Sequence, residues 1–299
     1  MSKRPQILFV LNEQDLHSEL VIPYLDREPI IFDPANIPDG VELSYFNKGN
    51  QQYIIIDDKV IDNVGAIWWR KLIDRSTENL PEKKIERTYG DRSFVEYVRH
   101  AIRIHTSNLG AFFGNAYWVS NPYHMLRANN KTWQLRVAYS VGMSVPQTLQ
   151  TSSTKRAKEF VKQQRGTCIV KSVSNYFPVR ADGTELMFWS QKIHSGQKIS
   201  YEGLHLAPAI FQKAIDGIDI RITVVGDKVF GSKITIDDSK LGGIRDWRVI
   251  GQGVKGKPLF EPHKVPDKLR IQCLNMVKKL GLSYGAYDFF LIKRVHIGF

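Results

Sequence analysis

The chain has 299 residues, 42% of them hydrophobic, which is enough to bury a substantial core and to form two or three modest domains. No segment approaches the roughly 20 apolar residues that cross a bilayer, and acidic and amide residues follow the basic start too early for a signal peptide. We therefore expect a cytoplasmic protein with no membrane partner. Cys168 and Cys273 lie in apolar stretches without CxxC spacing, so we expect them in the core rather than in a disulfide or zinc site.

The formal net charge of +12 favours an anionic partner, such as a nucleotide, an acidic peptide, a nucleic acid or lipid headgroups. Charge alone does not choose among these. The basic residues are dispersed, and even the densest short stretch, residues 81–87, contains two glutamates. Because a nucleic-acid arm would be more uniformly basic, we expect no specific nucleic-acid partner.

Residues 1–121 predict an N-terminal α/β domain. A helical stretch near residues 17–25 between two apolar runs gives a β-α-β beginning. A second helix is predicted from Arg92 to Leu109, with Gly110 as its stop. The predicted strands cover residues 7–12, 29–33, 52–57 and 65–70.

The rest of the chain predicts two α+β lobes, a central one over residues 122–198 and a C-terminal one over 199–299. A connector at residues 121–125 leads into the central lobe, where Gly142 is suited to a left-handed helix cap. From Ala209 the pattern becomes antiparallel, with a tight hairpin turn at residues 226–227. Helices are predicted at 131–141, 155–163 and 266–280, and strands at 145–151, 167–172, 186–193, 209–215, 219–226, 228–236 and 284–293.

Two lysines occupy positions where a phosphate could be bound. Lys171 lies at the end of a β-branched strand, which places its side chain at the rim of a sheet. Lys131 opens a helix, and helix N-termini prefer anions. Each lysine could equally face water without a ligand, so neither alone indicates a site.

Acidic and basic residues alternate on one predicted strand. Asp219 and Arg221 share one face, because successive side chains of a strand point to opposite faces. They could serve a ligand or only form a cross-strand salt bridge. Asp246 and Arg248 form a similar pair, for which ordinary loop polarity is the alternative.

Asp288 lies in an apolar strand, where an ionised carboxylate is costly unless it is paired or holds a metal. Magnesium, backbone amides or an arginine could each satisfy it. The histidines and serines show no zinc, triad or nucleophile-elbow spacing, and there is no Walker or Rossmann glycine motif. These patterns give zinc and hydrolase chemistry little support.

Taken in order, several segments resemble the ATP-grasp ligases, and their order is more specific than any one of them. The likeness is greatest to the maturases of microviridin-type peptides, or graspetides, whose first domain has a strand similar to IWWRK at residues 67–71. It spans nearly the whole chain. Ribosomal-protein glutamate ligases and glutathione synthetases resemble the chain more distantly. The segments are NK..QL..A...G..VP.TL from residue 130, IVK at 169–171, FQKAI at 211–215, DIRITVVGDKVFGSKI at 219–234, DWR at 246–248 and GAYDFFLI at 285–292.

This resemblance implies an ATP-grasp fold preceded by an α/β domain, with ATP and Mg²⁺ as cofactors. Lys131 and Lys171 would grip the ATP phosphates, and Asp219 would hold the ribose. The backbone that would read the adenine edge belongs to Gln212, Lys213, Ala214 and Ile215.

The resemblance also implies the chemistry. Arg221 and Arg248 are similar to the catalytic arginines near the transferred phosphate and acyl group, and Asp288 is similar to the first magnesium-binding acid. The substrate would be an acidic ribosomal precursor peptide with leader and core. One of its Asp or Glu side chains would become an acyl phosphate and then an ester or amide macrocycle.

Other interpretations stay open. One is an amino-acid or peptide ligase without macrocyclisation, and another is a catalytically impaired module that binds ATP or peptide. The family usually continues into a Glu-x-Asn strand that completes the magnesium site, whereas this chain ends at Phe299. We therefore expect a site without its last metal-binding strand and weak turnover. A homodimer is also left open.

Overall fold

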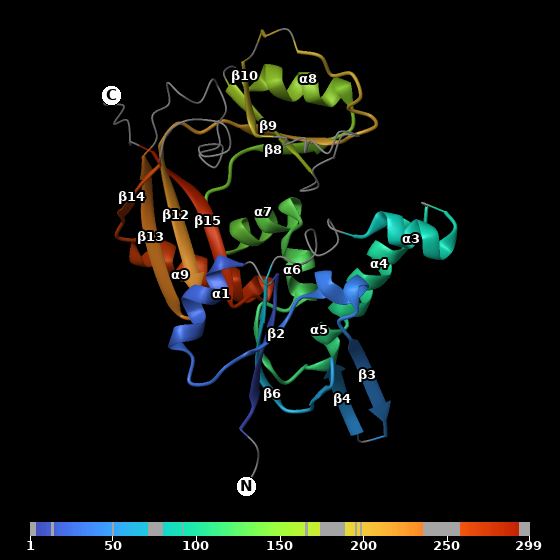
Figure 1. Ribbon diagram of the computed structural model, residues 1–299. Coiled ribbons are helices and arrows are strands. Elements are labelled where there is room, and N and C mark those ends of the chain that lie inside the picture. The colour runs from blue at the N-terminus through green and yellow to red at the C-terminus, as the bar shows by residue number, and fades with distance from the viewer. Residues whose placement is uncertain are drawn as a thin grey trace. The chain divides into compact units, whose positions relative to one another are not determined.

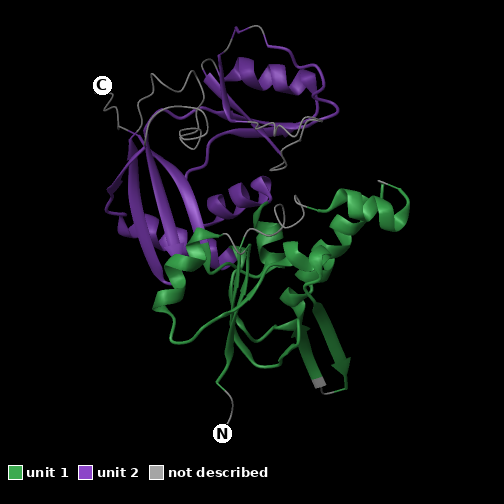
Figure 2. Ribbon diagram, in the orientation of Figure 1, with its two compact units in different colours: residues 1–129, 280–284 green, residues 130–279, 285–299 purple. Residues whose placement is uncertain are grey.

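The computed structural model describes residues 4–12, 15–49, 51–70, 80–91, 93–164, 167–173, 189–194, 196–197, 199–235 and 258–292. The fold divides into two compact units, shown in Figure 2. Unit 1 comprises Met1–Asn129 with Leu280–Tyr284, and unit 2 comprises Asn130–Lys279 with Gly285–Phe299. The division of the sequence into three lobes stays a prediction. Among the described residues, no helix is both long and apolar enough to cross a membrane.

Unit 1 is built on a four-stranded parallel sheet, of which β2 and β6 are labelled in Figure 1. In spatial order the strands are β2 (Ile30–Phe32), β1 (Gln6–Val10), β6 (Val64–Trp69) and β7 (Tyr117–Val119). All three neighbouring pairs are parallel. Leu8, Phe9 and Val10 of β1 are all buried, as expected for a central strand covered on both faces. The predicted β-α-β beginning is confirmed.

Helices and a small second sheet complete unit 1. The antiparallel sheet has the order β3-β4-β5. The predictions missed β3, β5, β7 and α3. In α3 only Ile85 is buried, so the helix lacks the repeated apolar positions from which a helix is predicted. The remaining elements are α1 (Leu16–Val21), η1 (Ile22–Tyr24), η2 (Pro34–Asp39), β3 (Leu43–Lys48), β4 (Gln51–Ile56), β5 (Lys59–Ile61), α3 (Glu82–Tyr89), α4 (Phe94–Ser107), α5 (Leu109–Phe112) and α6 (Pro122–Ala128).

Two predictions about unit 1 were wrong. Residues 121–125 do not form a connector, because the Asn121 side chain caps α6 by accepting a hydrogen bond from the Tyr123 amide at 3.0 Å and Pro122 suits the first helical turn. Gly110 does not stop a helix. It lies inside α5, where a Cβ atom would meet Cγ of Pro122 at 2.6 Å, so close packing rather than capping explains this glycine.

The first sheet of unit 2 has the order β10-β9-β11-β8, and each pairing is antiparallel. Helix α8 packs against one face, where Ala157 and Val161 join Cys168 and Phe211 in one apolar cluster. Cys168 is fully buried, as predicted. The elements are α7 (Lys131–Ser140), β8 (Thr148–Thr151), α8 (Thr154–Gln163), β9 (Thr167–Ser172), β10 (Gln191–His194) and β11 (Ala209–Lys213).

The second sheet of unit 2 has the order β14-β13-β12-β15. The predicted hairpin turn at Gly226 and Asp227 is confirmed, and Gly226 has a φ of 58°. The predictions missed β14, whose four residues are all exposed. Cys273 of α9 is fully buried, also as predicted. The elements are β12 (Ile218–Val225), β13 (Lys228–Thr235), β14 (Leu259–Pro262), α9 (Asp267–Leu280) and β15 (Tyr284–Leu291).

Candidate functional site

Lys171 belongs to a row of polar side chains on the first sheet of unit 2. Its Nζ donates to Oε1 of Gln212 at 2.8 Å, and Nε2 of Gln212 donates to Oγ1 of Thr148 at 2.9 Å. Cys168 and Phe211 face α8, so alternation along β9 and β11 turns this row to the opposite face of the sheet. The row therefore crosses three strands and holds the lysine in a fixed direction.

Lys131 lies at the same end of β9. The helix that it opens is capped by Asn130, whose side chain accepts a hydrogen bond from the Trp133 amide at 2.9 Å. Nζ of Lys131 donates to the carbonyl oxygens of Ser172 and Val173, at 3.2 and 3.5 Å. Ser172 directly follows Lys171, so the fold brings together two lysines that are 40 positions apart in the sequence.

Two of the backbone amides that were predicted to read the adenine edge already form hydrogen bonds within the protein. The Lys213 amide donates to the Gln147 carbonyl at 2.9 Å, and the Ala214 amide donates to the Thr167 carbonyl at 3.0 Å. These two amides are already used within the protein. An adenine edge would have to be met by other backbone groups of residues 212–215, so the contribution of Ile215 and of the carbonyls stays a prediction.

Strand β12 carries the predicted acid and base on one face. Asp219 and Arg221 lie opposite Ile234 and Ser232 of β13. The alternate residues Ile220 and Ile222 are almost completely buried, whereas Asp219 and Arg221 are half-buried. The alternation predicted from the sequence is confirmed. The predicted role of Asp219 at a ribose stays a prediction.

Asp288 of β15 pairs with Arg221 of the neighbouring β12. Nη1 of Arg221 lies 2.7 Å from Oδ1 of Asp288, and the side chains are 30% and 47% exposed. An arginine is thus the partner that satisfies this carboxylate, one of the alternatives left open by the sequence. A pair this exposed stabilises the fold by about 0–1 kcal/mol, so both groups remain open to exchange partners.

Asp288 fits the requirements of one magnesium ligand. Magnesium is usually held by one or two carboxylates together with phosphate oxygens and water, and this carboxylate is half exposed. Within the described ranges, no three His, Cys, Asp or Glu side chains come together as a metal site of their own. A metal here would therefore depend on a nucleotide for further oxygen ligands.

The sequence predictions missed some residues of this site, and they named one residue that the structure does not describe. Arg248 falls outside the described residues. Thr148 and the carbonyl of Ser172 were missed, because a threonine and a backbone oxygen carry no distinctive spacing. Only the register of β8 against β11 places Thr148 directly opposite Gln212.

These sheets and their connections form the fold of the ATP-grasp ligases. The macrocyclase MdnC of Microcystis aeruginosa MRC, solved with its precursor peptide MdnA, is similar with a TM-score of 0.76 and 23% identity, over 96% of this chain and 87% of that one. A RiPP-associated ATP-grasp ligase of Chryseobacterium gregarium, solved with ADP and a leader and core peptide, also has a TM-score of 0.76, with 22% identity over 96% and 85%. The ligase PsnB, solved with minimal precursor, Mg and ADP, has a TM-score of 0.72 and 21% identity over 96% and 85%.

No protein-family model matches this sequence, and no curated protein matches it either. At 21–23% identity the likeness to the solved structures establishes the fold. Of the segments that carry the resemblance in the sequence, the first covers α7 and part of β8, four lie on β9, β11, β12, β13 and β15, and DWR lies outside the described residues.

Proposed function

We propose that this protein is an ATP-dependent ligase that activates Asp or Glu side chains of a ribosomal precursor peptide. The observation that carries the proposal is the meeting of Lys131 and Lys171 at the end of β9. Two lysines held at the same end of one strand suit the phosphates of a nucleotide, whereas either lysine alone would not distinguish a site from ordinary solvent exposure. The similar ligases solved with ADP support this assignment.

The first step is phosphoryl transfer. An oxygen of the peptide carboxylate attacks the γ-phosphorus of ATP, the bond from that phosphorus to the β-phosphate oxygen breaks, and ADP leaves. Charge grows on the leaving oxygens during this step. Lys131 and Lys171 would hold the phosphates, and the contact of Lys171 with Gln212 keeps its ammonium group oriented before the nucleotide arrives.

Arg221 and Asp288 would exchange partners when the nucleotide binds. Asp288 would turn from the guanidinium of Arg221 to Mg²⁺, which neutralises phosphate charge when it is bound. Arg221 would then be released toward the oxygens that gain charge. Arg248 is proposed to assist at the acyl group, and Asp219 to hold the ribose.

The second step forms the new bond. A hydroxyl or amine of a Ser, Thr or Lys side chain attacks the carbonyl carbon of the acyl phosphate, phosphate leaves, and the nucleophile loses its proton. The product is an ester or an amide ring within the same peptide. The net charge of +12 suits an acidic peptide. The proposed reaction consumes ATP and would therefore take place in the cytosol.

The test is incubation with Mg²⁺, ATP and the small acidic peptides encoded beside this gene, followed by mass spectrometry. Loss of one water per ring, with one ADP formed for each water lost, is the expected result. A gain in mass by an added amino acid would instead identify a ligase without macrocyclisation. ATP binding with no ADP formed under any condition would identify a binding module and overturn the proposal.

A further inference from the structure

A second group of functional side chains lies in unit 1, at the carboxyl ends of β1 and β6. From β1 the chain leads to β2 at one edge of the sheet, and from β6 it leads to β7 at the opposite edge. The connections thus leave these two neighbouring strands in opposite directions. In open parallel sheets this arrangement creates a crevice at the carboxyl ends, where ligands bind. Arg70 lies there, because its amide donates to the Val10 carbonyl at 3.0 Å.

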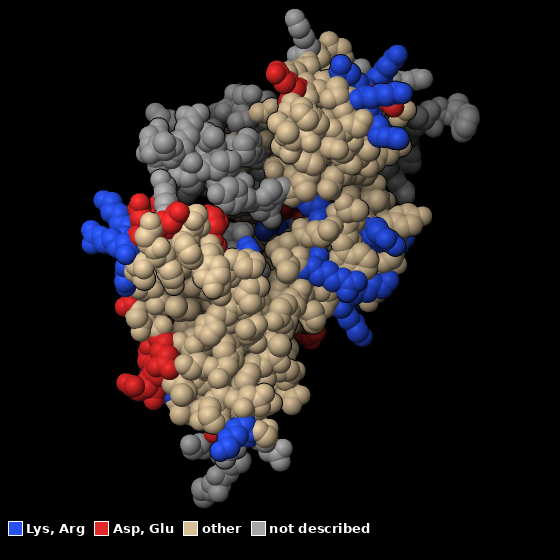
Figure 3. Space-filling model, turned by 90° about the vertical axis from the view of Figure 1, so that its right-hand side faces the viewer, with Lys and Arg blue, Asp and Glu red and all other residues tan. Residues whose placement is uncertain are grey.

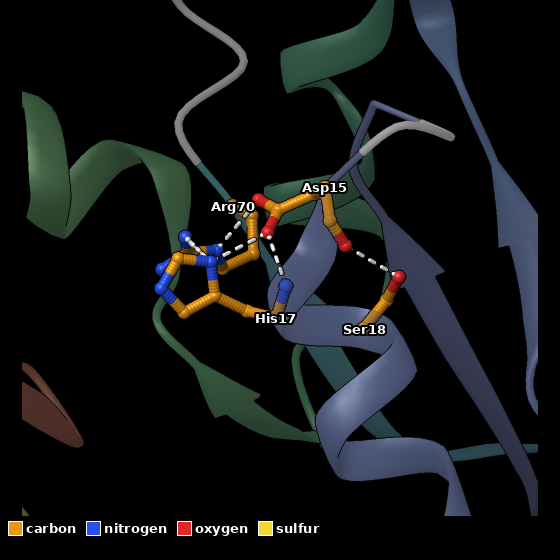
Figure 4. Close-up of polar contacts among 4 residues, drawn as sticks. All are labelled: Asp15, His17, Ser18 and Arg70. Atoms are coloured by element: carbon orange, nitrogen blue, oxygen red, sulfur yellow. Dashed lines mark hydrogen bonds and ion pairs between the residues drawn. The ribbon is translucent and has the colours of Figure 1, made fainter.

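Three polar side chains meet at this point, as Figure 4 shows. Nε of Arg70 lies 3.0 Å from Oδ2 of Asp15, while Oδ1 of Asp15 accepts a hydrogen bond from the His17 amide at 2.9 Å. Nδ1 of His17 lies 2.8 Å from Oδ1 of Asp15 and 3.0 Å from Nη2 of Arg70. The guanidinium group also lies over the Trp68 ring, 5.7 Å from its centroid. The cluster is therefore built from both strands' carboxyl ends.

The charges of the cluster are partly buried. The side chains of Arg70 and Asp15 are only 14% and 15% exposed, whereas that of His17 is 63% exposed. Partial burial raises the pKa of Asp15, but the hydrogen bonds from Arg70 and His17 and the charge of Arg70 outweigh it and hold the pKa below its ordinary value. Asp15 therefore stays ionised near neutral pH and orients the two basic groups.

Two donors of the cluster remain for a ligand. Among the described residues, none accepts a hydrogen bond from Nη1 of Arg70, and none forms a hydrogen bond with Nε2 of His17. Figure 4 shows the guanidinium and imidazole groups side by side. Leu16 and Leu20 lie one turn apart on α1, the helix that also carries His17, and are each 69% exposed. The surface thus combines a basic edge with an apolar stripe.

We propose that this cluster binds a side-chain carboxylate of the peptide substrate next to an apolar residue of that peptide. The identity of the ligand rests on the proposed function. The carboxylate accepts hydrogen bonds from Nη1 of Arg70 and from Nε2 of His17, and the apolar neighbour packs on Leu16 and Leu20. Such a contact fixes a part of the peptide that does not react.

The cluster favours a carboxylate over a phosphate. The Asp15 carboxylate lies beside both basic groups, so a bound anion meets a negative charge as well as the Arg70 guanidinium. A carboxylate brings one negative charge to this position, whereas a dianionic phosphate would bring two and be repelled more strongly by Asp15. The planar fork of arginine further suits the two oxygens of a carboxylate.

The test is an NMR titration of protein labelled with ¹⁵N in arginine and histidine, carried out without ATP. The probe is the capped dipeptide acetyl-Glu-Leu-amide, and acetyl-Gln-Leu-amide and inorganic phosphate are its comparisons. Saturable shifts of the Arg70 Nε and His17 ring signals are expected with the glutamate probe. Equal shifts with the glutamine probe, or tighter binding of phosphate, would overturn the proposal.

Two variants and a matched control sharpen the result. Arg70→Lys keeps the charge but loses the fork, and we expect binding of the glutamate probe to weaken about tenfold or more. Arg27→Lys is the control, because Arg27 also pairs with an aspartate, Asp26 at 2.6 Å, but contacts Pro5 just before β1 instead of the carboxyl ends. If Arg70→Lys unfolds, the exposed His17→Ala variant takes its place and should weaken binding several-fold.

The outcome separates this inference from the proposed function. Lys171→Ala should leave the titration unchanged, because Lys171 belongs to the other unit and acts on nucleotide. Binding of the probe in a protein that forms no ADP would contradict only the proposed ligase activity. Peptide-dependent ADP formation in a protein whose Arg70 and His17 signals do not move would contradict only the carboxylate site.

Discussion

Lys171 shows how the fold prepares a single side chain. Its ammonium group is directed by Gln212, which is itself held by Thr148, so a phosphate would meet a lysine that has already lost much of its rotational freedom. Replacing the lysine removes one charge-assisted contact, a class worth about 1.5–3 kcal/mol. We expect Lys171→Ala to weaken ATP binding about 10- to 150-fold in calorimetry. Lys228→Ala is the control, because Lys228 is 71% exposed beside the hairpin turn, and equal affinities in the two variants would contradict the assignment.

Arg221 is expected to act on turnover more than on binding. In the protein without nucleotide it neutralises Asp288, and in the reaction it would face oxygens that gain charge only in the transition state. Arg221→Ala should therefore lower kcat by roughly 100-fold or more while the Kd for ATP changes by less than about threefold. Single-turnover phosphate release and calorimetry measure the two quantities. A parallel loss of affinity and kcat would make Arg221 a simple binding residue.

The two cysteines give a pH-dependent prediction. Burial raises the pKa of the Cys273 thiol to about 11 and also raises that of Cys168. The thiolate is the reactive form, so at pH 8 both groups are almost entirely unreactive thiols in the folded protein. We expect iodoacetamide to label neither cysteine at pH 8 without denaturant and both in urea. Rapid labelling of either one in the folded protein would contradict their placement in the core.

At the scale of elements, local signals predicted well and long-range ones did not. The alternation around Asp219, the turn at Gly226 and the cap at Gly142 follow from rules that operate within a few residues, and the structure confirms all three. The helix α6 was missed because Asn121 and Pro122 signal a turn as readily as a helix start.

Gly110 gives the prediction at this scale. Its Cβ would meet the rigid ring of Pro122, so Gly110→Ala should lower the free energy of unfolding by about 1–3 kcal/mol through overpacking. Gly114 has open space around its Cβ position and serves as the matched control. Urea unfolding followed by tryptophan fluorescence measures both variants. Equal stability of the two would show that the contact with Pro122 does not constrain α5.

At the scale of the whole molecule, charge and strand order carry different information. Figure 3 shows Lys and Arg side chains in several separate groups on one face, with Asp and Glu beside some of them, in keeping with the dispersed charge of the sequence. The order β2-β1-β6-β7 could not be predicted, because it depends on pairings between strands far apart in the chain. The sequence therefore pointed to the lysines, the DIR strand and Asp288, but not to the cluster around Arg70.

The central claim is that a peptide carboxylate becomes an acyl phosphate, and hydroxylamine trapping tests it most directly. The protein is incubated with Mg²⁺, ATP, hydroxylamine and an acidic peptide whose Ser, Thr and Lys residues are replaced by alanine, so that hydroxylamine is the only nucleophile. The account predicts a hydroxamate on an Asp or Glu side chain, formed together with one ADP and one phosphate, and its loss in Lys171→Ala. Formation of AMP and pyrophosphate, or hydroxamate that appears without ATP, would contradict it.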